Sequence, residues 1–570
     1  MRAALKSLVI IGALLAAMLL TACSLIRPGY PDTPNAEKLQ KLGKLNLARV
    51  SSDPLVTKEE AMEKEPQELL VPLSAPQFNF ESEAIDLIAL RKILLENNLD
   101  IQISRLSKES SHQGVLAALG AFQPSISASV NLSETDSEST SGTVSTRARA
   151  STVSGSLGLT VPLLVGGSLE VDYSMSATET SITDLNRGSL GVADSESYAS
   201  TPNVSLSIPL LRGAGIKITE SPVTLAGYEE KASKARFRNQ FNSVLIQAEQ
   251  LYWNLYQAYL TVEIQNEQLE LADKQLNIAV GLYKSRAGTK ADVLRLQQSY
   301  NTQRQSVIEA NQTLRVTMRN LLSLLQSPNF KLDTKKILKP STEPSLAYRK
   351  IAAEAVEVLA LNNRSDLLED EYNIASAELQ LGIARDQVLP NLTLSLGVAF
   401  PGLSNSKYNS AFKNSSDIFS DPTLSAGLVF STPWGANEAA KANRANAYAN
   451  YLSSIATREK RIITIRQSVY DAVDELDVSW TLVLHQAHNL QLSKMEYDVE
   501  QRLFQVGLVT SNDMSDSLRN LTQSRLSELQ AVVRYQLALL GLATSTGMLP
   551  VHASVNLSDV PQSVPALENN

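Results

Sequence analysis

Few residues in this 570-residue chain could catalyse a reaction, since it has one cysteine and four histidines. His485 and His488 are three positions apart, so on a helix they could share a face and bind a metal ion transiently. A solvated surface pair is the simpler interpretation. The sequence contains no Ser/His/Asp arrangement, no phosphate-binding glycine loop and no metal-ligand spacing. We therefore predict no catalytic residues, no metal site and no enzyme activity.

The charge balance excludes a further class of protein. The chain has 51 Lys and Arg against 59 Asp and Glu, a formal net charge of −8. A nucleic-acid-binding protein would show a local basic excess instead, so we predict no nucleic-acid partner. One acidic group is prominent within a helical pattern, and it consists of Asp471, Asp474, Glu475 and Asp477. It could give a tunnel a negative potential or form a solvent-facing stripe, and both interpretations remain open.

The single cysteine follows an N-terminal targeting segment. Residues 8–20 form an apolar run of 13 residues behind two basic residues, which is too short for a membrane-spanning helix of about 20 residues. The run ends in Leu20-Thr21-Ala22-Cys23, which resembles a bacterial lipobox. The resemblance implies acylation of Cys23 and, because Ser24 follows it, sorting to the outer membrane. Apart from this covalent lipid we predict no cofactor; the alternative is an ordinary thiol after an ordinary signal peptide.

The remaining chain reads as a duplicated unit. Asn97 and Asn363, and likewise Pro124 and Pro390, are 266 positions apart, and each half reads as a helix, a proline and an alternating strand. This period is far longer than that of a solenoid repeat and indicates an internal duplication. The predicted segments are a signal peptide (1–22), an acylated tether (23–80), repeat 1 (81–326), a linker (327–348), repeat 2 (349–546) and a C-terminal tail (547–570).

Strands come first in each repeat. Six segments alternate apolar residues with small polar ones, four in repeat 1 (126–132, 157–161, 169–175, 204–208) and two in repeat 2 (392–400, 424–430). An apolar face opposite a hydroxyl-rich face is typical of a membrane barrel around a wet lumen, and a soluble sandwich is the alternative. We expect Ser-rich loops at 135–152 and 179–201. We expect a short turn at 163–167, although 163–200 could instead be an extracellular excursion outside the barrel.

Two long helical hairpins follow the strands. Pro209 to Gly288 spans 79 positions and Pro433 to Gly507 spans 74, with apolar residues at alternating spacings of three and four. This pattern predicts helices of about 60–70 residues, roughly 90–105 Å long, in coiled-coil packing. We expect Gly288 and Gly507 to end the first helix of each hairpin with positive φ. Asp292 follows Gly288 by four residues and Asp513 follows Gly507 by six, so we expect differently shaped tips.

At these tips the sequence, over about 83–547, resembles the TolC-like outer membrane efflux (outer membrane factor) family, in its lipoprotein branch. The resemblance implies a homotrimer of mixed α and β structure. A membrane β-barrel, with four strands from repeat 1 and two from repeat 2 per protomer, would continue into a long coiled-coil periplasmic α-barrel. The implied partners are outer-membrane lipid, a periplasmic adaptor (membrane fusion protein) and an inner-membrane pump. Six strands per protomer would make the barrel wider than the family's usual one.

The resemblance also assigns roles to tip residues. Val506, Gly507 and Leu508 match the motif that meets the adaptor, with Ala287, Gly288 and Thr289 as its weaker counterpart. Asp513, Asp516 and Asp292 match acidic positions that would ring the narrow periplasmic entrance in three copies and attract cations. N-capping or helix-surface roles are the alternative for these carboxylates. Phe504 and Val509 replace the tyrosine and arginine of the family's best-known lock, so that lock cannot be transferred.

These features predict the outer-membrane exit duct of a tripartite efflux or type I secretion system, which conducts its substrates passively. The protein would be lipid-anchored in the outer membrane and extend into the periplasm. The alternative is a non-conducting structural or surface-displaying outer-membrane lipoprotein. The doubled strands with polar faces favour the duct, because a closed scaffold needs no wet lumen.

Overall fold

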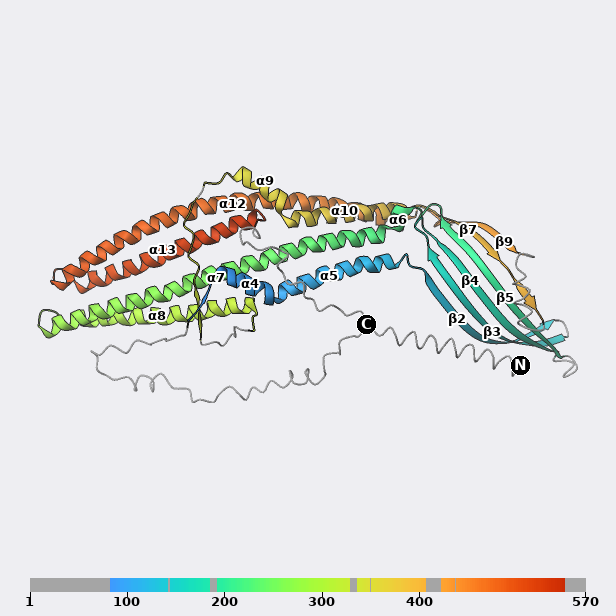
Figure 1. The fold of residues 1–570 in the computed structure, drawn as a ribbon, viewed down its shortest axis with the longest axis horizontal. Helices are drawn as coiled ribbons and strands as arrows, with labels where there is room; N and C mark the ends of the chain where they lie inside the picture. Colours follow the sequence, from blue (N-terminus) through green and yellow to red (C-terminus); the bar gives the residue numbers. More distant parts are fainter. Residues whose placement is uncertain are drawn as a thin grey trace.

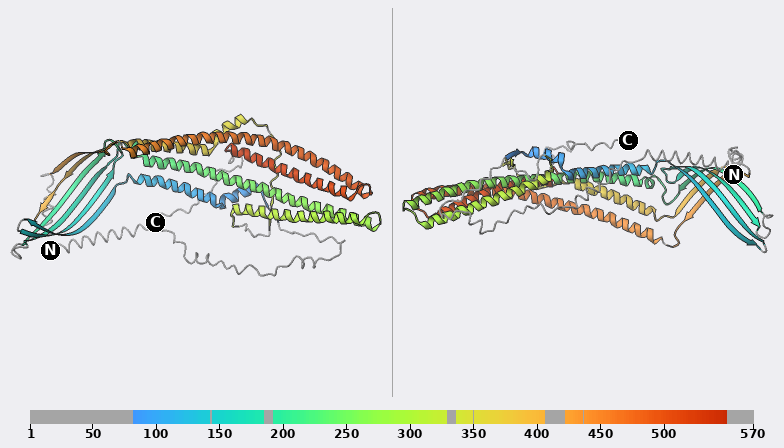
Figure 2. Two further views of the ribbon diagram at one scale, coloured as in Figure 1. Left: turned by 180° about the vertical axis from the view of Figure 1, so that it is seen from behind. Right: turned by 90° about the horizontal axis from the view of Figure 1, so that it is seen from below.

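A computed structural model describes residues 82–141, 144–184, 192–328, 336–348, 350–405, 422–435 and 437–548. The described chain is elongated, with a curved sheet at one end and long helices that run away from it (Figure 1 and Figure 2). The predicted signal peptide, Cys23 and the tether lie outside the described residues, as does most of the C-terminal tail. In the described ranges no helix combines the length and the apolar composition needed to cross a membrane.

One antiparallel sheet contains the six predicted strand segments. In order across the sheet, the strands are β2 (Ser125–Ser141), β3 (Val144–Pro162), β4 (Ser168–Asp184), β5 (Val192–Pro209), β7 (Asn391–Ala399) and β9 (Thr423–Ser431). A short strand, β8 (Gly402–Ser404), extends β7 along β5, because Asn203 lies opposite Ala399 and Ser200 opposite Gly402 in one register. Pro401 has no N–H and interrupts the ladder between them. The prediction of four strands from repeat 1 and two from repeat 2 is confirmed.

In the described parts of 135–152 and 179–201 the Ser-rich segments are strands and not loops, so that expectation is wrong there. β2 and β3 pair continuously from Ser125 opposite Thr160 to Ser141 opposite Val144, and β4 and β5 are similarly long. Hydroxyl side chains satisfy one another across these strands, as in the pair Ser129 and Ser156 (Oγ–Oγ 2.8 Å). The alternation of polar residues on both faces conceals the strand period from a hydrophobicity pattern.

A tight turn at residues 163–167 joins β3 to β4, as predicted, so the alternative of an excursion at 163–200 is wrong. Gly166 and Gly167 have φ of 94° and 81°. A Cβ atom on Gly167 would lie 1.9 Å from the carbonyl oxygen of Ser207, so only glycine fits this close approach to β5.

The duplication is visible in the short helices that precede the strands. In repeat 1, α4 (Leu87–Asn97) and α5 (Leu99–Gly120) have 11 and 22 residues. In repeat 2, α9 (Ala353–Asn363) and α10 (Ser365–Asp386) have the same lengths. A parallel strand pair, β1 (Ser82–Ile85) with β6 (Ile337–Pro340), lies beside the helices.

The two helical hairpins have the predicted lengths. The first consists of α7 (Ser221–Lys284, 64 residues) and α8 (Lys290–Leu325), preceded by the short α6 (Ile216–Thr219). The second consists of α12 (Glu438–Gln505, 68 residues) and α13 (Ser511–Ser545). Pro222 lies in the first turn of α7, where its missing N–H is harmless. α7 packs against α8 and α13, and α13 packs against α12, so α8 and α12 lie at the two edges of this layer.

Two apolar clusters join the first hairpin to the second, and a further one packs α12 against α13. The proximal cluster joins α4, the sheet-side half of α7, the end of α8 and α13, with Tyr252 and Leu321 fully buried. The tip cluster joins the other ends of α7, α8, α12 and α13, and includes Met514 and Phe504. Within the proximal cluster one ion pair is buried: Arg91 Nη2 lies 2.6 Å from Glu249 Oε1, with side-chain exposures of 9% and 2%.

Candidate functional site

At the tip of the second hairpin, α12 ends in a turn that contains one left-handed residue, Gly507. Gly507 has φ 76°, and its N–H donates to the carbonyl of Phe504 (3.0 Å). The next N–H, of Leu508, donates to the carbonyl of Leu503 (2.9 Å). Glycine takes this conformation without strain, as the sequence predicted.

The first tip has the same turn, but on different residues from those predicted. Arg286 has φ 61°, its N–H donates to Tyr283 O (3.1 Å), and Ala287 N–H donates to Leu282 O (2.9 Å). Arg286 is thus the counterpart of Gly507, and the predicted equivalence of Gly288 with Gly507 is wrong. A positive φ defines the turn, and in the first tip this φ occurs at Arg286 and not at Gly288.

This correction changes the counterparts of the tip motif. Residues 285–287, and not 287–289, correspond in the turn to Val506, Gly507 and Leu508. Six residues separate the left-handed residue from the aspartate in both hairpins, Arg286 to Asp292 and Gly507 to Asp513. The two tips therefore have the same shape, and the expected difference between them is wrong.

Asp292 and Asp513 both cap the helix in which they lie. Thr510 N–H donates to Asp513 Oδ2 (3.0 Å), and Asp513 N–H donates to Thr510 Oγ1 (3.3 Å). Thr289 and Asp292 form the same capping box at the start of α8. The hydrogen bonds from the Thr510 hydroxyl and N–H lower the pKa of Asp513 below its usual 3.8. The capping alternative considered for these carboxylates is therefore realised in the protomer.

Asp292 also joins the two hairpins. Ser511 Oγ donates to Asp292 Oδ1 (2.7 Å), and Arg295 Nη1 donates to Ser511 Oγ (3.3 Å). The pKa of Asp292 is lowered, first by the Thr289 hydroxyl and then by the Ser511 hydroxyl. Sequence reasoning missed Ser511, because nothing along the chain links two positions 219 residues apart.

Asp516 is half-buried beside a cation. Arg519 donates to it from one turn further along α13, and Asn512 Nδ2 donates to its Oδ2 (3.3 Å). Arg519 was also missed, although the spacing of three residues on a helix is the signal that could have found it.

The remaining tip residues form an exposed surface. Val506 and Leu508 are 68% and 73% exposed, so two apolar side chains that flank Gly507 face solvent at the tip. Ala287 and Thr289 are exposed and Gly288 is half-buried. Phe504 is buried in the tip cluster and Val509 packs against it, so at these two positions the chain has apolar packing in place of a polar lock.

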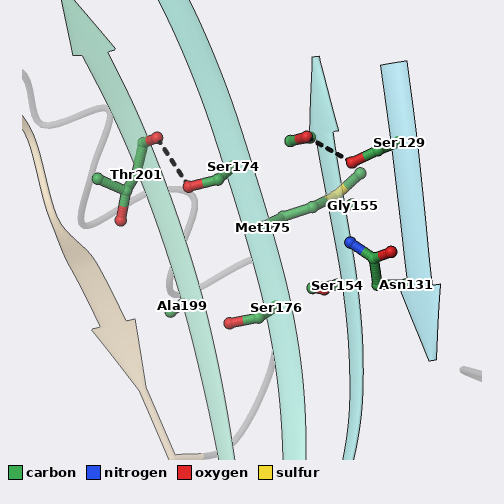
Figure 3. Close-up of a pocket in the computed structure, with 10 residues that line it drawn as sticks. Ser129, Asn131, Ser154, Gly155, Ser174, Met175, Ser176, Ala199 and Thr201 are labelled. Carbon is green, nitrogen blue, oxygen red and sulfur yellow. Dashed lines mark hydrogen bonds between the residues drawn. The ribbon is translucent and has the colours of Figure 1, made fainter. Parts of the chain in front are cut away.

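The sheet has one apolar and one hydroxyl-rich face. Ile126, Leu132 and Leu424 on the apolar face are 74–78% exposed in the protomer. On the other face, a hollow of about 220 Å³ is lined mainly by serines (Figure 3). Ser174 Oγ donates there to Thr201 O (3.4 Å). Such a surface presents hydroxyls to water along the sheet.

The other polar candidates are surface features. His485 and His488 are both exposed, and within the described ranges no three His, Cys, Asp or Glu residues are placed to hold a metal ion. In the acidic stretch, Arg534 Nε donates to Glu475 Oε1 (2.6 Å) and Tyr348 Oη donates to Asp477 Oδ1 (2.7 Å). Two of its four acidic residues, Glu475 and Asp477, thus accept hydrogen bonds within the protomer.

Comparison with known proteins agrees with this geometry. Residues 357–548 match the sequence model of the family described as outer membrane efflux protein. Nodulation protein T of Rhizobium leguminosarum bv. trifolii is 21% identical over 393 residues, which are 67% of this chain and 78% of that protein.

Solved structures share the fold. The Campylobacter jejuni CmeC outer membrane channel has a TM-score of 0.61 at 14% identity, over 83% of this chain and 90% of that one. The outer membrane protein VceC from Vibrio cholerae has a TM-score of 0.59 at 14% identity, over 81% and 96%. The outer membrane efflux protein family thus matches this chain over repeat 2, and the described chain has the fold of these outer membrane channels.

Proposed function

We propose that this chain is one protomer of a homotrimeric outer-membrane exit duct, which passively conducts substrates from a periplasmic adaptor and inner-membrane pump to the exterior. The single observation that carries the proposal is the sheet, with one face apolar and exposed and the other lined with hydroxyls. An exposed apolar face suits lipid, and a hydroxyl face suits a water-filled lumen.

Homotrimer formation is supported by free edges in both layers. β2 and β9 are the edge strands of the sheet, and α8 and α12 are the edge helices. α12 carries a long stripe of exposed apolar side chains, namely Ile463, Tyr470, Val478, Leu484, Leu492, Met495 and Val499. Joining β9 to β2 and α12 to α8 of the next copy would close both layers at once and cover this stripe.

The apolar face also indicates where the membrane would end. Leu132, Val153, Ala177 and Tyr198 lie in one row across β2–β5, and the next row on that face contains Glu134, Glu179 and Glu196. Acidic side chains are costly in hydrocarbon, so the outer boundary of the bilayer lies between these rows. A lipid on Cys23 would add a second anchor.

The tips are proposed to face the adaptor and to form the periplasmic entrance. Val506 and Leu508, both exposed and apolar, are suited to contact a partner protein, and the exposed Ser285, Arg286 and Ala287 are their counterparts in the turn of the first tip. Asp292, Asp513 and Asp516 would give the entrance its negative charge. Since Arg519 neutralises part of the charge of Asp516, we expect Asp513 to contribute most to cation selectivity.

Single-channel recording of the purified, acylated protein in planar bilayers tests this function. We expect small, cation-selective currents that grow or lose selectivity in the double variant Asp513→Ala/Asp516→Ala. A matched control is Glu109→Ala, which alters an exposed acidic residue of α5 away from the tip and outside the acidic stretch of α12. If the wild type and the double variant both insert as trimers and neither conducts, the passive duct is excluded, and the alternative of a structural outer-membrane lipoprotein takes its place.

A further inference from the structure

A layer of polar side chains interrupts the apolar interior of the hairpins. On α7 the fully buried part of the proximal cluster ends at Ala258, with partly buried apolar residues packed against it as far as Ile264, and the tip cluster begins at Leu269; corresponding gaps occur on α8 and α13. Four of the five buried residues within these gaps are polar; the five are Gln265, Gln268, Ala310, Asn311 and Thr522. We call the four polar residues the polar layer.

The hydrogen bonds of the polar layer do not join the two hairpins. Asn311 Nδ2 donates to Val307 O (2.8 Å) and Thr522 Oγ1 donates to Leu518 O (2.8 Å), each within its own helix. Gln265 accepts from the side chain of Gln303, within the α7–α8 hairpin. At the surface of this level, Arg525 and Glu267 do pair across the hairpins, but exposed pairs contribute little to stability.

Gln268 is the weakest point of the layer. Gln268 is 0% exposed, and neither its Oε1 nor its Nε2 has a hydrogen-bond partner among the described residues. A buried amide without partners lowers the stability of the contacts around it, because both groups have lost their bonds to water. Gln275, two turns nearer the tip, differs from it, because its Nε2 donates to Tyr497 Oη of α12 (3.4 Å) and only its Oε1 lacks a partner among the described residues.

The tip cluster, in contrast, is tied together as one body. It contains side chains from α7, α8, α12 and α13. The hydrogen bond from Ser511 to Asp292 adds a polar link between the hairpins at their ends. A well-packed unit therefore lies on each side of a poorly satisfied layer.

We propose that the polar layer is a hinge at which the tip cluster moves as a unit relative to the proximal cluster, and that Gln268 keeps the free-energy cost of this movement low. One consequence rests on the proposed duct: movement of the tips would widen its periplasmic entrance. The movement itself is a property of the helices and can be measured in a protein that does not conduct.

Amide hydrogen exchange in the full-length assembled protein tests the hinge. In the wild type we expect faster exchange in residues 269–307 and 497–521 than in residues 241–258 and 529–540. Gln268→Leu replaces the unsatisfied amide by an apolar side chain, and should slow exchange in the tip unit about tenfold without changing the proximal unit. Gln298→Leu, the same substitution at an exposed site on α8, should change neither unit.

A second variant tests whether the effect of leucine comes only from its branched shape, which differs from that of glutamine. Gln268→Met is unbranched like glutamine and should slow exchange in the same segments. The proposal is overturned if both variants leave tip exchange unchanged, or if both units slow equally, because the layer would then not separate two bodies. If the variants slow tip exchange but open as often as the wild-type channel, the hinge stands and its link to the duct is rejected. If they slow tip exchange and open about tenfold less often, both the hinge and its link to the duct are supported.

Discussion

Ser511 Oγ donates a 2.7 Å hydrogen bond to Asp292 Oδ1, which places the first residue of α13 against the first turn of α8. Asp292 thus caps its own helix with one carboxylate oxygen and holds the other hairpin with the second oxygen. The residue expected from sequence at a charged entrance is also a structural link between the tips.

Removing this link should loosen the tips. Ser511→Ala deletes the donor and leaves the Thr289–Asp292 capping box intact, so we expect a loss of about 0.5–1.5 kcal/mol confined to the tips. Amide exchange at residues 285–295 and 505–515 measures it. Ser515→Ala, which removes a hydroxyl bonded only to its own helix, is the control. Equal effects of the two variants would contradict the role of Ser511.

Acid should loosen the tips through Asp292 and Asp513. Both have a pKa below 3.8 in the folded protein. A lowered pKa contributes stability above the unfolded value, and this contribution is lost as the pH falls through the folded pKa. We therefore expect tip exchange to rise below about pH 4. The double variant Thr289→Val/Thr510→Val should exchange faster at pH 7 and respond less to acid; an unaltered acid response would show that other carboxylates control it.

The two left-handed tip residues should respond to substitution by different amounts. Gly507→Ala has open space for its Cβ but keeps φ at 76°, so we expect a loss of about 1–2 kcal/mol. Arg286→Gly relieves the same strain at the first tip and adds freedom to the unfolded chain, so the net change should stay within about 1 kcal/mol. Thermal unfolding compares them, and a larger loss for Arg286→Gly would mean that its side chain has a role of its own.

The buried ion pair in the proximal cluster should be sensitive to the loss of one partner. Arg91→Met leaves Glu249 buried without its counter-charge, and we expect destabilisation of about 3–5 kcal/mol. Arg91→Met/Glu249→Leu removes both charges and should recover most of that loss. The midpoint of thermal unfolding reports both variants. A double variant as unstable as the single one would show that packing, and not the unpaired charge, causes the loss.

The exposed stripe on α12 should be required for assembly. Leu492→Glu places a charge within it, so we expect trimers to dissociate at least tenfold more readily. Gln491→Glu adds the same charge at the neighbouring exposed position outside the stripe and serves as the control. Molar mass in detergent by light scattering distinguishes them. Intact trimers in both variants would place the contact between protomers elsewhere.

The sequence predicted those features that depend on periodicity. The strands around Ile126 and Leu424 and the helices on either side of each tip follow from apolar spacing of two or of three and four. It failed where hydroxyl residues occupy both faces of a strand, as in Ser133–Ser141, because such a segment has no apolar period. It also failed at Arg286, since a left-handed arginine has no signature in residue type.

The strands of the sheet differ in length, and this has a consequence for the shape of the assembled rim. β2 to β5 have 17 to 19 residues, whereas β7 and β9 have nine each. β8 carries the pairing beside β5 as far as Tyr198, so in a closed ring of three copies β5 would rise above this side only by the part before that residue. As far as the described strands go, the outer rim of such a ring would be uneven, with three raised arcs formed by the long strands of repeat 1.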